Sequence, residues 1–456
     1  MATGPRIAMG QPITSNTSIR FQDPLPEAAD VAIIGGGVIG IFAALYLARA
    51  GQRVLLCEKG RIAAEQSSRN WGWIRQQGRD AAELPIMMRA LELWRQADQH
   101  VAGACAFRAG GTVFLSRSDR ALEEYENWVA LAKLHGLKSE VLTNDQLADM
   151  FGNTVAPDWM TAVHTPSDAR AEPWQAVPAV AALARQEGAL LRENCAVRGL
   201  DIEAGRVAGI VTEHGLVRCP QVILAAGAWS SLFARRHGIN FPQLTLRGTV
   251  LQTAPLPQIF NGAACDEELG FRRREDGGYT LALADQHSYF LGPDGFRHAK
   301  TYLPLLRSAW SALDMHPAQP VGFPDGWRTT RKWRHDEQTP FENMRVLEPA
   351  PSASHISKAC ARFAARFPGL GKPKVRHAWA GMIDAMPDLV PIIDRVPQLD
   401  GLILATGMSA HGFGIGPGYG EILMKMATSQ PTEFDMSRFR FNRFTDGSKL
   451  EIGPEL

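Results

Sequence analysis

The sequence predicts an α/β fold, in which a discontinuous Rossmann-like domain is joined to an antiparallel-sheet α+β domain. The apolar run Val31–Ile34 leads through a glycine-rich turn and an apolar helix into a second strand that ends at Glu58. Two further buried strands, residues 222–226 and 401–406, each end at a glycine, and residues 246–300 read as short alternating strands. Because strands of the first type return twice, we expect one parallel sheet assembled from distant segments.

The first strand, turn and helix form a dinucleotide-binding fingerprint. Gly35 permits the tight turn, Gly37 lets the backbone approach the phosphates, and Gly40 lets the helix pack closely on the strand. The helix N-terminus faces the charge of the pyrophosphate. Glu58 follows Gly40 by 18 residues, close to the spacing of about 20 expected for an acceptor of the ribose 2′-OH. A carboxylate there disfavours a 2′-phosphate, so NADP is not expected.

Composition and charge narrow the class of protein. The chain has 456 residues, of which 45% are hydrophobic and 21% charged, as in a globular protein of two domains. A net charge of +1 without a basic stripe predicts no nucleic-acid partner. The fingerprint explains the most apolar stretch, residues 31–50, so no transmembrane segment is expected. Residues 1–29 lack the apolar core of a secretory signal and predict a mobile or loosely packed arm.

The six cysteines are scattered singly, without C-x-x-C pairs or zinc-ligand spacing. This pattern predicts reduced, mostly buried thiols and no metal site. We therefore expect a location in the cytoplasm or peripheral to the inner membrane.

Hydrophobic periodicity and turn residues predict the remaining elements. Helices are expected over residues 83–100, 119–135, 144–151 (capped by Thr143 or Asn144), 172–187 (ended by Gly188), 353–367 and 418–428. Strands are expected over residues 110–115, within 189–218 and through 246–300, with a hairpin turn at 275–278.

A polar and aromatic segment, residues 67–75, follows the second strand. Ser67 and Ser68 either cap a helix or contact the cofactor. Trp71 and Trp73 flank a glycine and either wall a pocket or belong to the core.

The C-terminal segment makes a family resemblance specific. It contains Trp379-Ala-Gly-Met-Ile-Asp384-Ala-Met-Pro387-Asp388 and, after a strand, Gly407-Met-Ser-Ala-His411-Gly412-Phe413-Gly414-Ile-Gly416-Pro417-Gly418. With the fingerprint and the segment 222–230, these motifs resemble the D-amino-acid oxidase/glycine oxidase superfamily of FAD-dependent oxidoreductases. They are most similar to its sarcosine oxidase and secondary-amine (D-amino acid) dehydrogenase branch. The resemblance covers residues 30–430.

The resemblance implies one FAD and a division into two domains. The FAD-binding domain would comprise residues 30–105, 155–245 and 350–430, the substrate domain residues 106–154 and 246–349, with an N-terminal arm over 1–29 and a C-terminal tail over 431–456.

The resemblance also implies the residues of the site. The expected cofactor-binding residues are Gly35, Gly37, Val38, Ile39, Gly40, Glu58, Lys59, Ser67, Ser68, Arg69, Asn70, Trp71, Val197, Ala226, Gly227, Trp229, Gly381, Asp384, Gly407, Gly412, Phe413, Gly414 and Ile415. The expected catalytic residues are Arg75, which matches an arginine that binds the substrate carboxylate, His411, which matches a histidine next to the flavin, and His287 and Tyr289 from the substrate domain. Further polar candidates in that domain are Arg247, Arg272, Arg274, Arg328 and Arg331.

The implied reaction oxidises the C–N bond of a D-amino acid or N-substituted amino acid by hydride transfer to flavin N5, and water hydrolyses the resulting imine. Elementary electrostatics agrees with a flavin ring at the C-terminal loop. Glycines after Thr406 allow close approach of the backbone, and a helix predicted to begin near Gly418 points its positive N-terminus at the site. That charge stabilises a reduced flavin, which is negative around N1 and the C2 carbonyl oxygen.

Departures from the family pattern refine these expectations. Ala378 or Trp379 stands where some members carry a flavin-linking cysteine, and Trp174 lies near the place of a histidine anchor, so we expect non-covalent FAD. Ile383 stands where glycine oxidases carry an arginine, and Gly414 where sarcosine oxidases carry a lysine.

The strand of residues 279–284 lacks the lysine with which the sarcosine oxidases activate oxygen. This favours a dehydrogenase that passes electrons to a quinone or carrier. Three alternatives remain open. The first is a 2-hydroxy acid dehydrogenase, in which His411 or His287 would be the essential base. The second is a non-catalytic or incomplete subunit whose FAD is mainly structural, which the unmatched positions Ile383 and Gly414 would explain. The third is a flavoprotein subunit of a heteromeric amine or opine dehydrogenase, which would require partner subunits.

Overall fold

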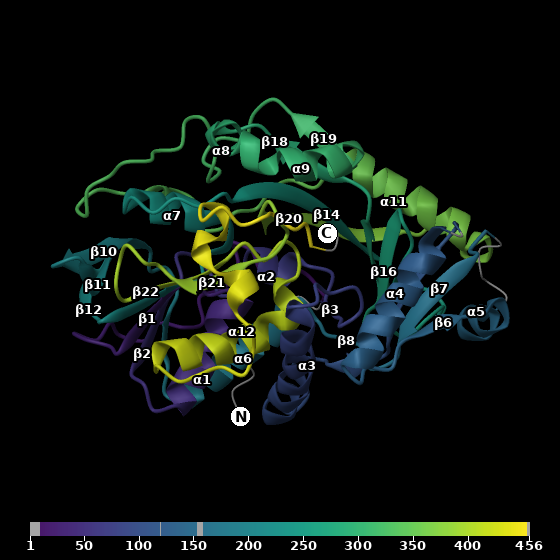
Figure 1. Ribbon diagram of the computed structural model, residues 1–456, viewed down its shortest axis with the longest axis horizontal. Helices are drawn as coiled ribbons and strands as arrows, with labels where there is room; N and C mark the ends of the chain where they lie inside the picture. Colours follow the sequence, from purple (N-terminus) through teal and green to yellow (C-terminus); the bar gives the residue numbers. More distant parts are fainter. Residues whose placement is uncertain (1–9, 119, 153–157, 454–456) are drawn as a thin grey trace.

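The computed structural model describes residues 10–118, 120–152 and 158–453. Within these ranges, a six-stranded sheet forms one half of the molecule (Figure 1), and its strands are parallel except at the β21 edge. Its spatial order is β21 (Ile392–Arg395), β22 (Leu402–Thr406), β13 (Gln221–Leu224), β1 (Val31–Ile34), β2 (Val54–Cys57) and β9 (Leu190–Arg192). Segments from both ends of the chain therefore pair, and the predicted α/β class is confirmed.

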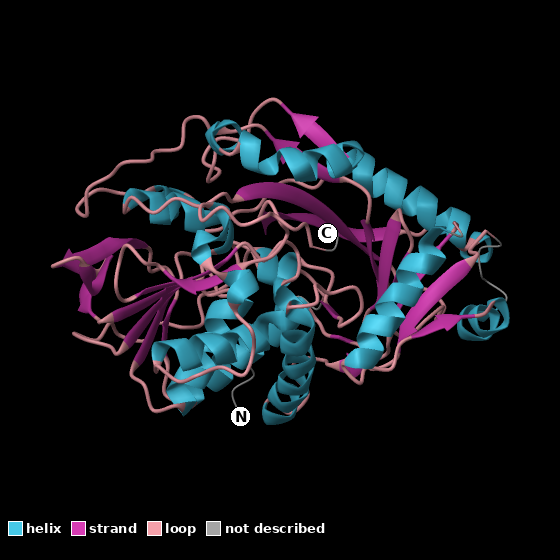
Figure 2. Cartoon of the chain, in the orientation of Figure 1, coloured by secondary structure: helices cyan, strands magenta, loops and turns pink. Residues whose placement is uncertain are grey.

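Both faces of this sheet are covered, which explains why its central strands are continuous apolar runs. Helices gather on one face (Figure 2), and a small antiparallel sheet packs on the other. The helices are α1 (Val38–Arg49), α6 (Pro173–Gln186) and α12 (Gly412–Ala427), with α3 (Glu83–His100) against α12, and the small sheet consists of β10 (Val197–Glu203), β11 (Arg206–Thr212) and β12 (Gly215–Arg218).

Helix α12 begins at Gly412, six residues before the start that the sequence predicts. Its glycines, which indicate a loop by composition, are contact points between helices. A Cβ at Gly416 would lie 2.8 Å from Val38 Cγ2, and a Cβ at Gly420 would lie 2.6 Å from Phe42 Cβ. The absence of side chains lets α12 approach α1 closely, and tertiary packing outweighs the low helix propensity of glycine.

The second half of the molecule is built on a ten-stranded sheet in the described part of the chain, mostly antiparallel. Its order is β19 (Leu313–His316), β18 (His287–Phe290), β14 (Leu244–Thr253), β17 (Tyr279–Leu283), β16 (Leu269–Arg273), β15 (Ala263–Cys265), β5 (Thr112–Ser116), β7 (Thr161–Thr165) and β6 (Glu140–Leu142), and β20 (Val375–Ala385) also pairs with β14. Strands β7 and β20 come from ranges that the sequence analysis assigns to the FAD-binding domain. The boundary expected between residues 154 and 155 lies outside the described residues.

The remaining elements are one small sheet, further helices and short 3₁₀ turns. A three-stranded sheet is formed by β3 (Trp73–Ile74), β8 (Ala169–Arg170) and β4 (Arg108–Ala109). The other helices are α2 (Gln66–Arg69), α4 (Arg120–Leu134), α5 (Asn144–Phe151), α7 (Ser230–Arg236), α8 (Pro293–Arg297), α9 (Ala299–Ala309), α10 (Pro340–Asn343) and α11 (Ala353–Arg366). Short 3₁₀ turns are η2 (Gly227–Trp229), η3 (Trp310–Ala312), η4 (Pro368–Leu370), η5 (Ser437–Phe439) and η6 (Phe441–Phe444).

Most predicted helices are confirmed, and one strand prediction is wrong. Helix α3 has the predicted bounds, and α5 begins after Thr143, whose side chain forms a capping box with Gln146. Residues 293–300, expected as strand, instead form α8 and the start of α9. Pro293 at the first helical position favours this turn, because its fixed φ suits a helix start.

The N-terminal segment is packed rather than loose over residues 10–29, contrary to expectation. Ile13 and Phe21 are buried, and Ile13 N donates to Ser68 Oγ at 3.1 Å. Phe21 N donates to the Glu193 carboxylate at 3.1 Å. Two apolar anchors and these hydrogen bonds offset the entropy of ordering the segment.

All six cysteines are free thiols, and five of them are buried. Among the described residues, no helix is long and apolar enough to cross a membrane. The same residues contain no group of three or more His, Cys, Asp or Glu side chains arranged to hold a metal ion.

Candidate active site

The turn between β1 and α1 requires its glycines. Gly35 has a φ of +112°, and a Cβ there would lie 2.4 Å from the Ala225 carbonyl oxygen. A Cβ at Gly40 would lie 2.1 Å from the Gly35 carbonyl oxygen, so only glycine fits this contact. Gly37 is the N-cap of α1, and Val38 N donates to Ser67 Oγ at 2.9 Å. Ser67 therefore satisfies a backbone donor at the start of α1.

A first cavity opens at this turn and extends along the ends of β1, β13 and β22. Of the expected cofactor-binding residues, it is lined by Gly35, Gly37, Val38, Ile39, Glu58, Lys59, Ser67, Asn70, Val197, Ala226, Gly227, Trp229, Asp384, Gly412 and Phe413. A Cβ at Gly227 would meet no atom within 4 Å although this residue lines the cavity, so the cavity has open room beside it.

Glu58 lies where β2 ends, at the edge of this cavity. Its carboxylate accepts hydrogen bonds from Gly36 N and Gly60 N, both at 2.7 Å. Burial raises the Glu58 pKa to about 7, although the charge of Lys59 and the bond from Gly36 N oppose that rise. A carboxylate near its pKa at neutral pH can both accept and donate a hydrogen bond to a hydroxyl.

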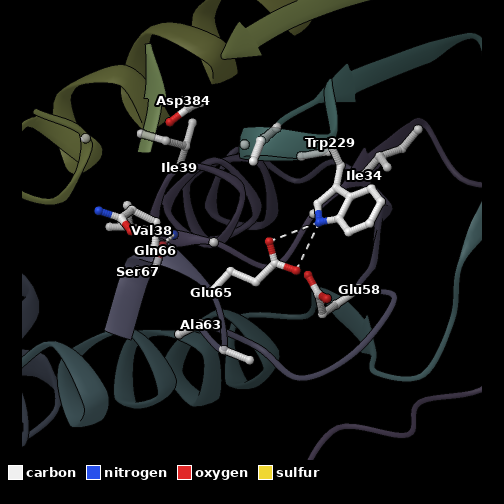
Figure 3. A pocket seen from close by; sticks show the side chains of 18 of the residues that line it. Ile34, Val38, Ile39, Glu58, Ala63, Glu65, Gln66, Ser67, Trp229 and Asp384 are labelled. Carbon is white, nitrogen blue, oxygen red and sulfur yellow. Dashed lines mark hydrogen bonds between the residues drawn. The ribbon is translucent and has the colours of Figure 1, made fainter. Parts of the chain in front are cut away.

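Glu65 is a cavity residue that the sequence analysis misses. Figure 3 shows its carboxylate facing the Trp229 indole, whose Nε1 donates to both carboxylate oxygens at 3.1 Å. Lys59 Nζ lies 2.6 Å from Glu65 Oε1 and 4.5 Å from the centre of the Trp229 ring. This network fixes the wall of the cavity next to Glu58.

Asp384 lies on β20, across the cavity from Glu65 (Figure 3). Its Oδ2 accepts from Gly407 N at 2.8 Å and from Met408 N at 3.2 Å. Burial raises its pKa to about 6 despite these bonds. Asp384 thus holds the loop that follows β22, where Gly407 has a φ of +77°.

A second cavity adjoins the first, and both are lined by Gln66, Asn70, Ala410 and Phe413. Of the remaining expected residues, Arg69, Trp71, Arg75, His287, His411 and Gly414 line the second cavity. Trp71 and Trp73 both line it and meet edge to face with ring centres 5.3 Å apart, so they wall a pocket. Strands β5, β14, β15, β17 and β18 supply residues on the far side.

Arg75 lies at the junction of the two halves. Its guanidinium donates to the carbonyl oxygens of Gln77 and Gly78 and lies 5.5 Å from the centre of the Phe114 ring. No carboxylate in the described residues forms an ion pair with it. Burial and the charge of Arg79 lower the Arg75 pKa to about 10, so the group stays cationic at neutral pH. The cavity therefore contains a guanidinium that has no anionic partner among the described residues.

His411 lies beside Arg75, with its Nε2 at 3.5 Å from Arg75 Nη2. Its Nδ1 lies 3.3 Å from the carboxylate of Glu83, at the start of α3. Burial, and then the charge of Arg79, lower the His411 pKa to about 4, so the ring is neutral at pH 7. Burial alone would raise the Glu83 pKa, but the contacts with His411 and Arg79 bring it down to about 2.

Six expected residues line neither cavity: Gly40, Ser68, Gly381, Gly407, Ile415 and Tyr289. Gly381 pairs with Gly248 between β20 and β14, where a Cβ would lie 2.1 Å from Gln66 Oε1. The hydroxyl of Tyr289 packs against Gly295 of α8.

The five arginine candidates, Arg247, Arg272, Arg274, Arg328 and Arg331, also lie outside both cavities. Arg272 pairs with Glu172 at 3.0 Å and is fully buried. The sequence analysis names it as a polar candidate of the substrate domain, but its partner comes from a distant segment that no local pattern reveals.

Arg79 and Glu83 are the site residues that sequence reasoning misses most clearly. Both are buried, and their side chains approach to 3.8 Å. The sequence gives one indication of Glu83, which is an acid on the apolar face of the helix over 83–100, in its first turn. Such an acid is ordinarily explained by the helix dipole.

The residues of the first cavity fit a dinucleotide. The glycine turn, the N-terminus of α1 and the open space at Gly227 provide a backbone cradle, and Glu58 provides a hydroxyl partner.

The comparison with known families agrees with this geometry. A family model described as FAD dependent oxidoreductase (DAO) matches residues 30–426, and the chain belongs to this family. FAD is thus its cofactor, and the predicted resemblance is confirmed.

Individual relatives are distant. Human mitochondrial sarcosine dehydrogenase is 24% identical over 92% of this chain and 42% of its own length. Human peroxisomal sarcosine oxidase is 22% identical over 93% of this chain and 98% of its own. The chain thus spans less than half of the sarcosine dehydrogenase. Among solved structures, L-amino acid deaminase from Proteus myxofaciens in complex with anthranilate has a TM-score of 0.90 at 26% identity, covering 96% of this chain and 98% of that one.

Proposed function

We propose that the protein oxidises the C–N bond of an amino acid or an N-substituted amino acid, with FAD in the first cavity and the substrate in the second. The observation that carries this proposal is Arg75. Its guanidinium lines the second cavity, next to the junction with the first, without an ion-pair partner among the described residues. A planar guanidinium can bind a carboxylate through two parallel hydrogen bonds.

The glycine turn and the N-terminus of α1 would hold the pyrophosphate, and Glu58 the ribose. The N-terminus of α12, from Gly412 to Gly414, would face the flavin ring. When bound, FAD supplies the acceptor for the hydride that leaves the carbon next to the substrate nitrogen.

The second cavity would orient the substrate and exclude water. Arg75 binds the carboxylate, while Trp71, Trp73 and Phe114 supply apolar walls. The neutral ring of His411 adds no positive charge next to the amine, which must lose its proton before oxidation.

Two observations bear on the stereochemistry and substitution of the substrate. The resemblance to the secondary-amine and D-amino acid dehydrogenase branch supports a D-amino acid or an N-substituted amino acid. The structural similarity to L-amino acid deaminases from Proteus myxofaciens and Proteus vulgaris supports an L-amino acid.

An anaerobic screen tests the proposal. The FAD-loaded protein is mixed with D- and L-amino acids, N-methyl amino acids, opines and 2-hydroxy acids, and the flavin absorbance is followed. Bleaching by an amino acid or an N-substituted amino acid is expected. Bleaching by 2-hydroxy acids alone would indicate a 2-hydroxy acid dehydrogenase instead. No bleaching by any of these compounds would favour a subunit whose FAD is mainly structural.

We predict that the FAD is held without a covalent bond, because neither Ala378 nor Trp379 offers a nucleophile for the flavin. Acid precipitation of the yellow protein should release all of the flavin into the supernatant. Absorbance that stays with the washed pellet would contradict the prediction.

We also predict faster turnover with an artificial dye acceptor than with oxygen. No lysine is found among the described residues that line the second cavity, and β17 contributes Leu283 to it. Steady-state rates with each acceptor, at one substrate concentration, check this. Equal rates would make the protein an oxidase.

A further inference from the structure

A buried polar chain connects Arg75 to residues outside the second cavity. Arg75 Nη2 lies 3.5 Å from His411 Nε2, and His411 Nδ1 lies 3.3 Å from Glu83 Oε2. The side chains of His411 and Glu83 are 3% and 1% exposed, so water does not compete for their polar atoms. Three segments of the chain supply these side chains: the residues after β3, the start of α3 and the N-cap of α12.

Glu83 itself is held from two further sides. Tyr419 Oη of α12 donates to Glu83 Oε1 at 2.9 Å, and Arg79 Nη1 lies 3.8 Å from Glu83 Oε2. Arg79 also donates to the carbonyl oxygens of Arg75 and His411, at 3.1 and 3.3 Å. The carboxylate is therefore fixed in place and ionised, and its Oε2, which makes no hydrogen bond within the described residues, lies next to the imidazole.

These contacts between Arg75, His411 and Glu83 permit one arrangement of protons on the His411 ring. A charged imidazolium would place Nε2–H against the guanidinium of Arg75, so two donors and two positive charges would meet. A neutral ring with its proton on Nδ1 avoids this. Nδ1 then carries the proton 3.3 Å from Glu83 Oε2, and the Nε2 lone pair accepts from Arg75 Nη2. The lowered pKa of His411 also favours the neutral ring.

We propose that Glu83 is a positioning residue for the substrate carboxylate. It fixes His411 as the Nδ1–H tautomer. His411 Nε2 then orients the guanidinium of Arg75, which binds the carboxylate. This inference rests on the proposed function of Arg75. Glu83 lines neither cavity and is separated from the substrate by the imidazole.

The test combines a tautomer measurement with kinetics. In the FAD-loaded protein with ¹⁵N-labelled histidine, long-range ¹H–¹⁵N spectra distinguish the two tautomers, and His411→Asn identifies the His411 signals. The wild-type ring should carry its proton on Nδ1. In Glu83→Gln, the amide can donate to Nδ1 and shift the proton to Nε2, which then opposes Arg75.

Glu83→Gln should also raise KM for the best carboxylate-bearing amine about tenfold, because the charged Arg75 guanidinium would lose the Nε2 acceptor that orients it. The value of kcat should change less, because Glu83 does not touch the reacting atoms. Glu83→Asp should recover part of the KM. Glu92→Gln, an exposed acid on the same helix, is the matched control and should leave both constants unchanged.

Two results would overturn the inference. One is a wild-type His411 that is protonated on Nε2 or on both nitrogens, which decides the question even if Glu83→Gln does not fold. The other is an unchanged KM in a folded, FAD-loaded Glu83→Gln. The tautomer is read without turnover, so a wild type that no amine reduces would refute the proposed function while leaving this measurement valid.

Discussion

Arg75→Ala should raise KM for carboxylate-bearing amines at least about 30-fold while the protein retains its FAD. Removing one partner of a buried, hydrogen-bonded charge pair costs about 2–5 kcal/mol, and each 1.4 kcal/mol is about a factor of ten. The side chain contacts only Gln77, Gly78, Phe114 and His411 among the interactions of the described residues, so its loss breaks no ion pair of the fold. Steady-state kinetics and FAD content are the measurements.

Two companion variants make this result specific. Arg75→Lys keeps the charge but loses the planar fork, so its KM should lie between the wild type and Arg75→Ala. Arg206→Ala removes an exposed arginine outside both cavities and should behave as the wild type. A KM that is unchanged in Arg75→Ala would remove Arg75 from the substrate site.

Gly40→Ala should lower the free energy of unfolding by roughly 1–3 kcal/mol and cause loss of FAD on purification. The added Cβ would lie 2.1 Å from the Gly35 carbonyl oxygen, and neither backbone segment can yield without displacing the cradle of the first cavity. Denaturant unfolding and the ratio of flavin to protein absorbance measure both effects.

Gly369→Ala is the matched control for this substitution. Gly369 lies in η4 with ordinary φ, and a Cβ there would meet no atom within 4 Å. Its stability and FAD content should equal those of the wild type. Full FAD retention by Gly40→Ala would show that the close contact of helix and turn is not needed for binding.

Much of the lining of the first cavity could be predicted from sequence because its signals are local. Gly35, Gly37 and Glu58 are found by their spacing along one β-α-β unit, and each of these residues lines the first cavity. The order of helices and strands follows from periodicity for the same reason.

The misses arise where distant segments meet. The sequence predicts the start of α12 too late, because its glycines serve contacts with α1 that no local pattern records. Arg272 resembles a ligand until its partner Glu172 is known. Glu83 resembles an ordinary first-turn acid until α12 brings His411 to it. Packing against remote residues decides the role of each.

The most direct test of the account is a crystal structure of the FAD-loaded protein with a carboxylate ligand of the substrate class. We predict FAD in the first cavity from Gly37 to Phe413, and the ligand carboxylate on the Arg75 guanidinium in the second. A ligand whose carboxylate lies away from Arg75, or a flavin ring that is not at the junction of the two cavities, would contradict it.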